Sequence, residues 1–383
     1  MTTTENHTSN ARLEAFNEKL AGKNWSGQWE AEKYLMASIG GPQPAGVPHR
    51  WGWAETKEAL DEATDVLGTV DTARRHLTCV NPGLKDRGAI TTHNLAAGFQ
   101  LVKSGEICWS HRHSPGALRF VTQGHPEAYT AVDGEKLVME DFDLLLTPRF
   151  SWHDHHNPSD KDVYWLDALD VGLLQKLGAL FYEPYGEDSQ KLRPSTSEWV
   201  GTRSHWLRPT WEEERTTRLP LRYAWSDVRE RLALYGNEVG SPYDGLALRY
   251  ANPVTGGPTM DTIDCWVQRL VPGFSGKTHR RTSSAVVYVI AGNGTLETDN
   301  GTITFQAGDV ISLPNWTNFR WTNASASDEV LLFSVHDIPA YQRLGLLYEE
   351  PEAIIGATPA PANPTPPLKP LYAQGAFYGK DER

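Results

Sequence analysis

Three histidines in the first half of the chain have the spacing of a metal site. His111 and His113 are separated by one residue, so in a β-strand both side chains project from the same face. Two imidazoles on one face suit a divalent first-row metal such as zinc, copper, iron or nickel. His153 follows the apolar segment 144–147, which predicts another buried strand, and we expect it to supply the third ligand. A His-x-His pair also occurs on ordinary surfaces, so the prediction depends on the rest of the pattern.

The composition limits the classes of protein to consider. The chain has 383 residues and a formal net charge of -12, so it lacks the basic face that a nucleic-acid partner requires. Its three cysteines, Cys79, Cys108 and Cys265, form no disulfide framework and indicate a reducing compartment. Residues 1–10 are polar, unlike a signal peptide, and are predicted to be disordered. No segment reaches the roughly 20 apolar residues of a membrane span. We therefore predict a cytoplasmic protein with no membrane partner.

The periodicity of apolar residues divides the chain into helical and strand-rich parts. Helical spacing occupies residues 11–38, with a break at Gly27, and residues 54–66. Short apolar runs bounded by turn residues follow, and they predict strands at 76–80, 98–102, 118–122, 128–132, 144–147 and 163–166. Helical spacing returns at 173–181 and 223–235, and strand texture runs from 246 to 335. We predict a mainly β chain with an N-terminal helical arm (1–70), a first barrel (71–182), a linker with a helix (183–240), a second barrel (241–340) and a proline-rich tail (341–383).

The second strand-rich region repeats the first. Its glycines, prolines and asparagine recur at nearly constant offsets, which is where turn geometry demands such residues. The matched pairs are Gly105 with Gly273, His111 with His279 and Gly124 with Gly292 (279 − 111 = 168), then Pro148 with Pro314, His153 with Phe319 and Asn157 with Asn323 (319 − 153 = 166). His113 corresponds to Arg281, which has no lone pair for a metal, and Phe319 has no donor atom. We therefore predict one metal-binding copy and one copy without metal.

These motifs resemble those of the cupin superfamily. The first cupin motif runs Gly, five residues, His-x-His, and later a Glu and a Gly; the second contains a Pro and a His four residues before an Asn. Ala117 stands at the position of the Glu, and Phe142 and Phe150 replace two glycines of the second motif. The resemblance implies a bicupin of two jelly-roll β-barrels. A centre of three His without the Glu would leave positions for both a substrate and dioxygen, as in facial-triad iron sites.

A closer resemblance is to the bicupin ring-cleaving dioxygenases of gentisate, salicylate and 1-hydroxy-2-naphthoate. It rests on residues 110–121, 143–148 and 152–157, and on the Asn81-Pro82-Gly83 turn. It implies one Fe(II) per subunit on the three histidines, and a small aromatic acid and O2 as substrates. The ring would open between the carbons that carry the carboxyl and the ortho hydroxyl. Members are homo-oligomers, often tetramers, and we expect the same here.

Several charged and polar residues are expected to bind the substrate. Arg119 lies six residues after His113, an even step, so a continuous strand would aim both side chains at one face. Its guanidinium could hold a carboxylate in a bidentate pair. The resemblance adds a second anion contact at Arg74 or Arg75, of which only one can face inward, and we favour Arg74. It also offers Gln100 as a polar pocket residue.

One further histidine is a candidate for proton transfer. His155 lies two residues beyond His153 and could share its face, and the resemblance makes it the acid–base histidine beside the substrate hydroxyl. Asp167 is expected to orient it, and Asn157 to support the site from behind the ligands. His93 is a weaker candidate, and His156 is expected to be structural.

The substrate itself stays open at this point. Gentisate, converted to maleylpyruvate, ranks first because it is the commonest activity in the resembling family, and 1-hydroxy-2-naphthoate or a substituted salicylate is the alternative. Ala96 and Gly98 are small, so a pocket that they line would have room for a bicyclic ring. Two other classes remain as rivals: a zinc cupin isomerase acting on phosphorylated sugars and a non-catalytic binding bicupin.

Overall fold

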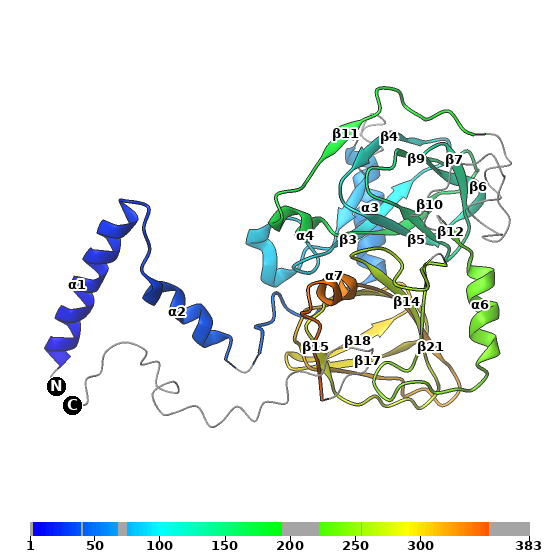
Figure 1. Cartoon of the computed structure of the whole chain (residues 1–383). Coiled ribbons are helices and arrows are strands. Elements are labelled where there is room, and N and C mark those ends of the chain that lie inside the picture. The colour runs from blue at the N-terminus through cyan, green and yellow to red at the C-terminus, as the bar shows by residue number, and fades with distance from the viewer. Residues whose placement is uncertain (1–2, 40, 68–74, 194–221, 254, 352–383) are drawn as a thin grey trace. The chain divides into compact units, whose positions relative to one another are not determined.

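The computed structural model describes residues 3–39, 41–67, 75–193, 222–253 and 255–351 (Figure 1). The chain divides into two compact units. Among the described residues, one unit contains those up to residue 43 and the other contains those from 44 to 351. The described residues are rich in strands, and the described helices include none long and apolar enough to cross a membrane.

The N-terminal unit contains two helices, α1 (Thr3–Ala21) and α2 (Gln28–Ala37). They pack through Phe16 and Trp29, whose rings stack at 6.0 Å. Asn17 accepts a hydrogen bond from the Trp29 indole at 2.9 Å. A Cβ at Gly27 would lie 2.1 Å from the Trp29 ring, so a larger residue at the predicted break would displace that ring. The prediction of disorder for residues 1–10 was wrong from Thr3 onward, because extending a helix costs less than starting one.

The larger unit contains two antiparallel jelly-roll copies. The strands of the first copy are β2 (His76–Thr78), β3 (Ala96–Val102), β4 (Ile107–His113), β5 (Ala117–Gln123), β6 (His125–Val132), β7 (Glu135–Met139), β8 (Leu144–Thr147), β9 (His153–His156), β10 (Val163–Leu169) and β11 (Tyr182–Pro184). Those of the second copy are β13 (Leu246–Arg249), β14 (Asp264–Leu270), β15 (Arg280–Arg281), β16 (Ala285–Ala291), β17 (Asn293–Thr298), β18 (Gly301–Gln306), β19 (Val310–Leu313), β20 (Phe319–Thr322), β21 (Val330–His336) and β22 (Glu349–Glu350).

Each copy has a large sheet and smaller sheets facing it. The two six-stranded sheets have the orders β12-β8-β5-β10-β3-β2 and β1-β19-β16-β21-β14-β13. The first copy is completed by β11-β4-β9-β6-β7, and the second by β18-β17-β20 and β15-β22. The described strands thus form separate sheets rather than one closed sheet in each copy. The mainly β bicupin architecture is confirmed.

Two short strands at the ends of the large sheets have partners that the sequence did not indicate. β1 (His49–Trp51) precedes the first copy but pairs with β19 of the second. β12 (Arg222–Tyr223) directly precedes α6 and the second copy but pairs with β8 of the first. The helix α3 (Trp53–Val66) lies where the sequence predicts it. The short helix α4 (Val171–Lys176) follows β10, and α7 (Ile338–Arg343) follows β21. η2 (Pro82–Arg87) is a 3-10 helix, and α6 (Trp225–Leu234) links the copies.

The largest hydrophobic cluster joins the two copies face to face. Alternate residues of β5 point to opposite sides, so Leu118 and Phe120 enter this shared core while Arg119 and Val121 face the interior of the first barrel. Phe120 stacks on Phe333 of the second copy with centroids 4.0 Å apart. The same alternation that builds the shared core therefore turns the polar residues of β5 toward the histidines.

The turns of the cupin motifs keep their backbone geometry without their glycines. Phe142 and Phe150 have φ angles of 63° and 60°, in the left-handed region that favours glycine. Their counterparts in the second copy, Gly308 and Trp316, have φ angles of 91° and 53°. The turn is thus a property of the fold, and the surrounding strands hold it even where a side chain opposes it.

Most of the predicted strands and helices can be compared with the structure, and some lie outside the described residues. The six strands predicted in the first copy are all present, with boundaries that differ by a few residues. The helix predicted over 173–181 is shorter, because the chain turns at Gly178 (φ 64°) and continues toward β11. Residues 194–221 of the predicted linker and residues 352–383 of the proline-rich tail lie outside the described part.

Candidate metal centre

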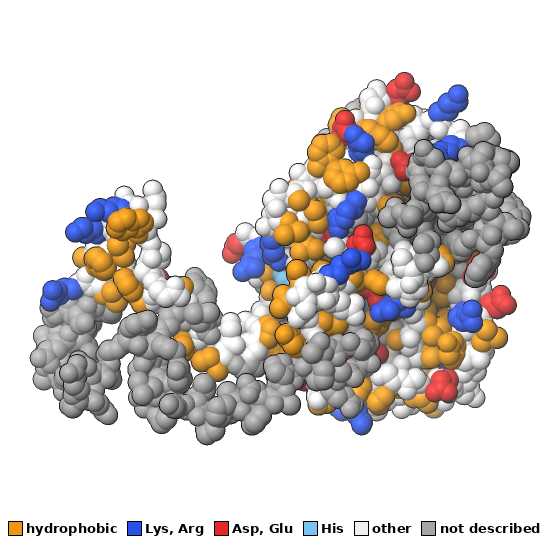
Figure 2. Space-filling view, in the orientation of Figure 1, with side chains coloured by type: hydrophobic (Ala, Val, Ile, Leu, Met, Phe, Trp, Pro, Cys, Tyr) orange, Lys and Arg blue, Asp and Glu red, His pale blue; other side chains and the backbone are white. Residues whose placement is uncertain are grey.

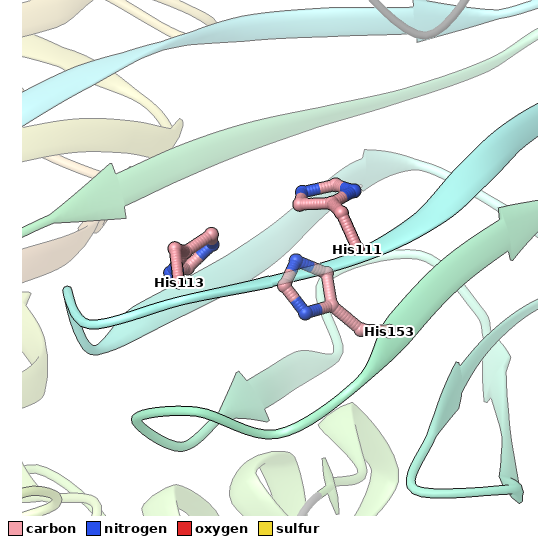
Figure 3. A group of neighbouring side chains, drawn as sticks. All are labelled: His111, His113 and His153. Atoms are coloured by element: carbon pink, nitrogen blue, oxygen red, sulfur yellow. The ribbon is translucent and has the colours of Figure 1, made fainter. Parts of the chain in front are cut away.

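The three predicted ligands meet inside the first barrel. β4 carries His111 and His113, β9 begins at His153, and the two strands pair so that His111 lies opposite His153 (Figure 3). One ligand nitrogen from each ring lies within 4.8 Å of the other two. Within the described ranges, this is the one group of three or more His, Cys, Asp or Glu side chains arranged to hold a metal.

Backbone carbonyls fix the orientation of all three rings. The Nδ1 atoms of His111, His113 and His153 lie 2.9, 2.8 and 3.0 Å from the carbonyl oxygens of Trp109, Pro115 and Ser151 respectively. A carbonyl can only accept, so each Nδ1 carries the proton and each Nε2 keeps its lone pair. Such a hydrogen bond behind the ring is the usual support of a metal-ligating histidine.

Burial keeps these imidazoles neutral. Burial lowers the pKa of His113 to about 4, and the neighbouring His111 adds to the effect. Burial also lowers the pKa of His153 well below its ordinary value, and the positive charge of Arg119 lowers it further. A metal needs the unprotonated ring, so at neutral pH the site is ready to bind one.

One further observation shows that these residues suit a metal ion. The Nε2 atom of His153 is buried and has no hydrogen-bond partner among the described residues. Buried polar atoms are nearly always paired, so an orphaned lone pair that faces two other imidazole nitrogens indicates a missing electrophile. Ala117, at the position of the cupin Glu, is fully buried and has no ligating atom.

Arg119 lies beside the histidines and is held in place by two contacts. Its Nη1 donates to the Thr147 hydroxyl, and its Nε lies 3.4 Å from a carboxylate oxygen of Asp167. Burial is the main cause of the lowered pKa of His111, His113, His153 and His155, and the nearby charge of Arg119 contributes to each shift. Its Nε has no hydrogen bond of good geometry, which leaves donor capacity inside the barrel.

The partner of His155 differs from the one expected. His155 is buried, and its Nδ1 lies 2.8 Å from the hydroxyl of Thr130, the residue opposite it on β6. Asp167 lies on β10, where it faces Arg119 and, at 3.8 Å, the imidazole of His76. The expectation that Asp167 orients His155 is therefore corrected: the residue that it orients is Arg119. The sequence could not show this, because strand order decides which residues are opposite each other.

Gln100 and Asn157 have clear partners. Gln100 lies on β3 opposite Trp165, and its amide donates to the thiol of Cys108 at 3.2 Å. Asn157 donates to the carbonyls of Val102 and Lys161 and so closes the loop after β9. Asn323 makes the same kind of loop contacts in the copy without the histidines. Asn157 therefore stabilises this loop rather than the metal ligands.

The remaining candidates separate into placed and unplaced residues. Arg74 lies outside the described residues, so its expected role stays a prediction. Arg75 does not offer its guanidinium to a substrate carboxylate, because it is buried in a bidentate pair with Glu106 at 2.8 and 2.9 Å. His93 contacts the hydroxyl of Tyr341 at 2.6 Å, away from the three ligands. His156 pairs with Asp154 at 2.8 Å, which agrees with a structural role.

His76 was not expected near the centre. It faces Asp167, and it fills the space beside Gly98, where a Cβ would come within 2.7 Å of the imidazole. The small size of Gly98 therefore serves the close approach of β2 rather than an empty pocket. Only the pairing of β2 with β3 brings these residues together, so the spacing along the chain gave no signal.

The segment after α4 borders the centre. Tyr182 of β11 pairs with His113 across the strands, and its ring stacks on His111 at 5.3 Å. On the face drawn in Figure 2, hydrophobic side chains gather over β4 and β11, where Trp109 and Tyr182 are 46% and 66% exposed. The barrel thus presents an aromatic rim beside one metal ligand.

The fold and the centre define a cupin protein with a three-histidine metal site. The sequence model of the cupin domain family matches residues 98–169 and 266–336, one match in each copy. The chain is 69% identical over 372 residues to a 1-hydroxy-2-naphthoate 1,2-dioxygenase from Nocardioides sp. (strain KP7), covering 97% of this chain and 96% of the relative. It is 36% identical over 349 residues to a 5-aminosalicylate 1,2-dioxygenase from Comamonas sp, covering 90% of this chain and 91% of the relative.

A solved structure gives the same family. The salicylate 1,2-dioxygenase from Pseudoaminobacter salicylatoxidans, solved with gentisate, superposes with a TM-score of 0.77 at 28% identity, covering 88% of this chain and 93% of that chain. The chain belongs to the bicupin family of gentisate, salicylate and 1-hydroxy-2-naphthoate dioxygenases, and it is a ring-cleaving dioxygenase.

Proposed function

We propose that the first barrel binds one Fe(II) per subunit through His111, His113 and His153 and opens the ring of an ortho-hydroxy aromatic carboxylate. The observation that carries the site is the buried, unpaired Nε2 of His153 facing the two other imidazoles. Imidazole ligands accept several first-row metals, and the family's chemistry favours iron among them. When bound, iron supplies the redox chemistry that lets dioxygen react with the ring.

The polar residues around the centre have separate roles in this proposal. Arg119, held by Thr147 and Asp167, provides a fixed cation for the substrate carboxylate. His155 is anchored at Nδ1 by Thr130, so its Nε2 can hold the proton of the substrate hydroxyl. Gln100 offers an amide from the opposite strand, and Arg74 remains a proposed second contact for the carboxylate. These residues position the substrate before any bond changes.

We further propose 1-hydroxy-2-naphthoate as the substrate. From the sequence alone, gentisate ranked first and the naphthoate was its alternative. The relative at 69% identity is named for the naphthoate, whereas one named for gentisate, from Aquipseudomonas alcaligenes, is 34% identical. Ala96 lies an even step from Gln100 on β3 but is buried in a cluster with Leu84 and Ile90, so the preference for the naphthoate comes from the sequence identity. Both substrates share the carboxylate and the ortho hydroxyl, so the catalytic residues would act in the same way on each.

Oxygen uptake by the Fe(II)-reconstituted protein tests this proposal. Gentisate, salicylate and 1-hydroxy-2-naphthoate are supplied in parallel, and kcat/KM is compared. We expect the highest value with the naphthoate, together with a new absorbance from the ring-opened product. A higher value with gentisate would reverse the substrate order, and no uptake with any acid despite bound iron would refute the reaction.

The assembly is part of the same proposal. We expect a homo-oligomer, a tetramer by resemblance to the family, and sedimentation velocity of the iron-loaded protein measures it. A monomer that turns over the substrate at full rate would contradict this expectation.

A further inference from the structure

A groove lies between the linking helix and the edges of both large sheets, away from the histidines. Its walls are β12, which borders the sheet of the first copy, α6, and β13, which borders the sheet of the second copy. Its volume is about 330 Å³, which is enough for a small organic molecule. On the face drawn in Figure 2, the surface over α6 mixes hydrophobic, basic and acidic side chains.

The floor of the groove is apolar. Val228 of α6, Leu248 of β13 and Val267 of β14 line it. Val267 is 2% exposed and belongs to the core shared by the two copies, so the floor is part of a rigid element. A flat, apolar molecule would find a complementary surface there.

Tyr250 lines the same groove, and its hydroxyl is buried. Tyr250 is 4% exposed, yet its hydroxyl has no hydrogen-bond partner among the described residues. The neighbouring Tyr223 packs edge-on against it at 5.4 Å, but the Tyr223 hydroxyl already donates to the carbonyl of Ala251 at 3.0 Å. An unpaired buried hydroxyl is rare and indicates a polar group that the protein itself does not provide.

The rim carries cationic groups with unused donors. Arg222 forms ion pairs with Asp143 and Glu140, so it lines the groove without offering a free positive charge. Arg249 gives its Nε to Asp264 at 2.8 Å and keeps its terminal nitrogens, with 34% of the side chain exposed. Arg231, exposed on α6, has no carboxylate within ion-pair distance in the described ranges, and the acidic Asp227 on the rim is itself solvated. The rim can therefore receive an anion.

We propose that this groove binds an aromatic carboxylate at a second site, distinct from the metal centre. The ring lies on Val228, Leu248 and Val267, and the carboxylate meets the guanidinium groups of Arg231 and Arg249. A polar substituent of the ring pairs with the Tyr250 hydroxyl. Because β12 and β13 belong to different large sheets, a ligand here contacts both barrels at once. Binding in the groove does not depend on the reaction proposed for the metal centre.

Calorimetric titration of the full-length, iron-loaded protein with 2-naphthoate tests the site. This probe is an aromatic carboxylate without the ortho hydroxyl. We expect saturable binding that persists in His153→Phe, in which the metal centre is disrupted. Arg231→Ala should weaken it about tenfold or more, as loss of a charge-assisted hydrogen bond does. Tyr250→Phe should weaken a hydroxylated probe, 6-hydroxy-2-naphthoate, about threefold and leave 2-naphthoate unchanged.

Two control variants distinguish binding in the groove from binding elsewhere on the protein. Arg229→Ala changes an exposed arginine of the same helix that does not line the groove, and it should leave the affinity unchanged. Tyr250→Phe removes a hydroxyl without a partner, so the protein should stay as stable as the wild type in thermal melts. Three results would overturn the proposal: no saturable binding at millimolar probe, binding that disappears in His153→Phe, or equal affinity in Arg231→Ala.

Discussion

The two barrels place rings at the same pair of positions but give them different chemistry. His111 and His153 lie opposite each other with ring centroids 4.3 Å apart, and their counterparts His279 and Phe319 lie 4.1 Å apart. The strand pairing is the same at both places. The backbone thus brings two aromatic rings close together in each copy, tilted by 60° in the first and 51° in the second, and the side-chain type decides whether a metal can bind.

The third ligand position shows how the second barrel is closed. Arg281 replaces His113, and its Nη2 lies 3.0 Å from His279 Nε2 and 2.9 Å from Asp244. Its Nε lies 3.1 Å from Glu349. Burial alone would raise the pKa of Asp244, but Arg281 and His279 hold it well below its usual range. A fixed guanidinium therefore occupies the lone pair that a metal would use.

The short strand that pairs with the third ligand position also differs between the two barrels. Tyr182 of β11 and Glu349 of β22 stand at corresponding positions, opposite His113 and Arg281 (349 − 182 = 167). The next residues repeat one ion pair, since Arg112 binds Glu183 and Arg280 binds Glu350, each at 2.6 Å. Tyr182 is an exposed ring that stacks on His111, whereas Glu349 is buried beside Arg281. One scaffold therefore places either an exposed aromatic ring or a buried carboxylate at this position.

The largest expected effect comes from giving the first barrel the residue of the second. His153→Phe should abolish metal binding and oxygen uptake, because it removes one of three ligands while keeping a ring at that place. Metal content by mass spectrometry and uptake with 1-hydroxy-2-naphthoate measure it. His156→Ala is the matched control on the same strand, and full activity in His153→Phe would show that the ligands are others.

Removing the ring of Phe319 tests the opposite copy. Phe319 is 3% exposed, so Phe319→Ala should lower the free energy of unfolding by about 3–5 kcal/mol through lost burial and the cavity left behind. Urea denaturation measures the loss. The metal content of the folded protein should not change, and a parallel loss of metal would mean that the second barrel is not independent of the centre.

As the pH falls, the ionisable residues of the two barrels should lose their contributions to folding stability in different pH ranges. The folded pKa of His113 lies at about 4, below its unfolded value of about 6.5, so the unfolded chain binds the proton first. Stability of the metal-free protein should therefore fall as the pH drops from about 6.5 to about 4, by about 1.4 kcal/mol per pH unit for each such histidine. The Asp244 carboxylate, whose folded pKa is lowered, should lose its contribution only below its ordinary pKa of about 3.9. Denaturation of His113→Gln across the upper window should show a shallower slope, and an unchanged slope would contradict the assignment.

The smallest effect is expected at the strained turns. Phe150 is half exposed with φ of 60°, so Phe150→Gly relieves the backbone but loses the contact with Phe181 and costs chain entropy. We expect a net change within about 1 kcal/mol in urea denaturation. The counterpart Trp316 is 6% exposed, and there the same replacement should be clearly destabilising. A large loss at Phe150 would mean that its ring, rather than the fold, holds the turn.

Much of the centre could be predicted because its signals are local. Alternation along a strand places His111 and His113 on one face, and the repeat identifies Arg281 and Phe319 as the residues that replace His113 and His153. The predictions that failed concerned pairs of residues far apart in sequence. Asp167 orients Arg119 rather than His155, and Asn157 holds a loop, because strand order and register decide these contacts.

The sequence by itself determined the ligand types, the turn positions, the twofold repeat and the loss of the second centre, since each depends on residue type and short spacing. The tertiary structure decided what surrounds the ligands. It brought His76 to Asp167 and Thr130 to His155, placed β1 and β12 at the edges of the large sheets, and left the Tyr250 hydroxyl unpaired in a groove with arginines on its rim. Those contacts join strands distant in sequence, and the burial of the shared core, rather than any local preference, selects their register.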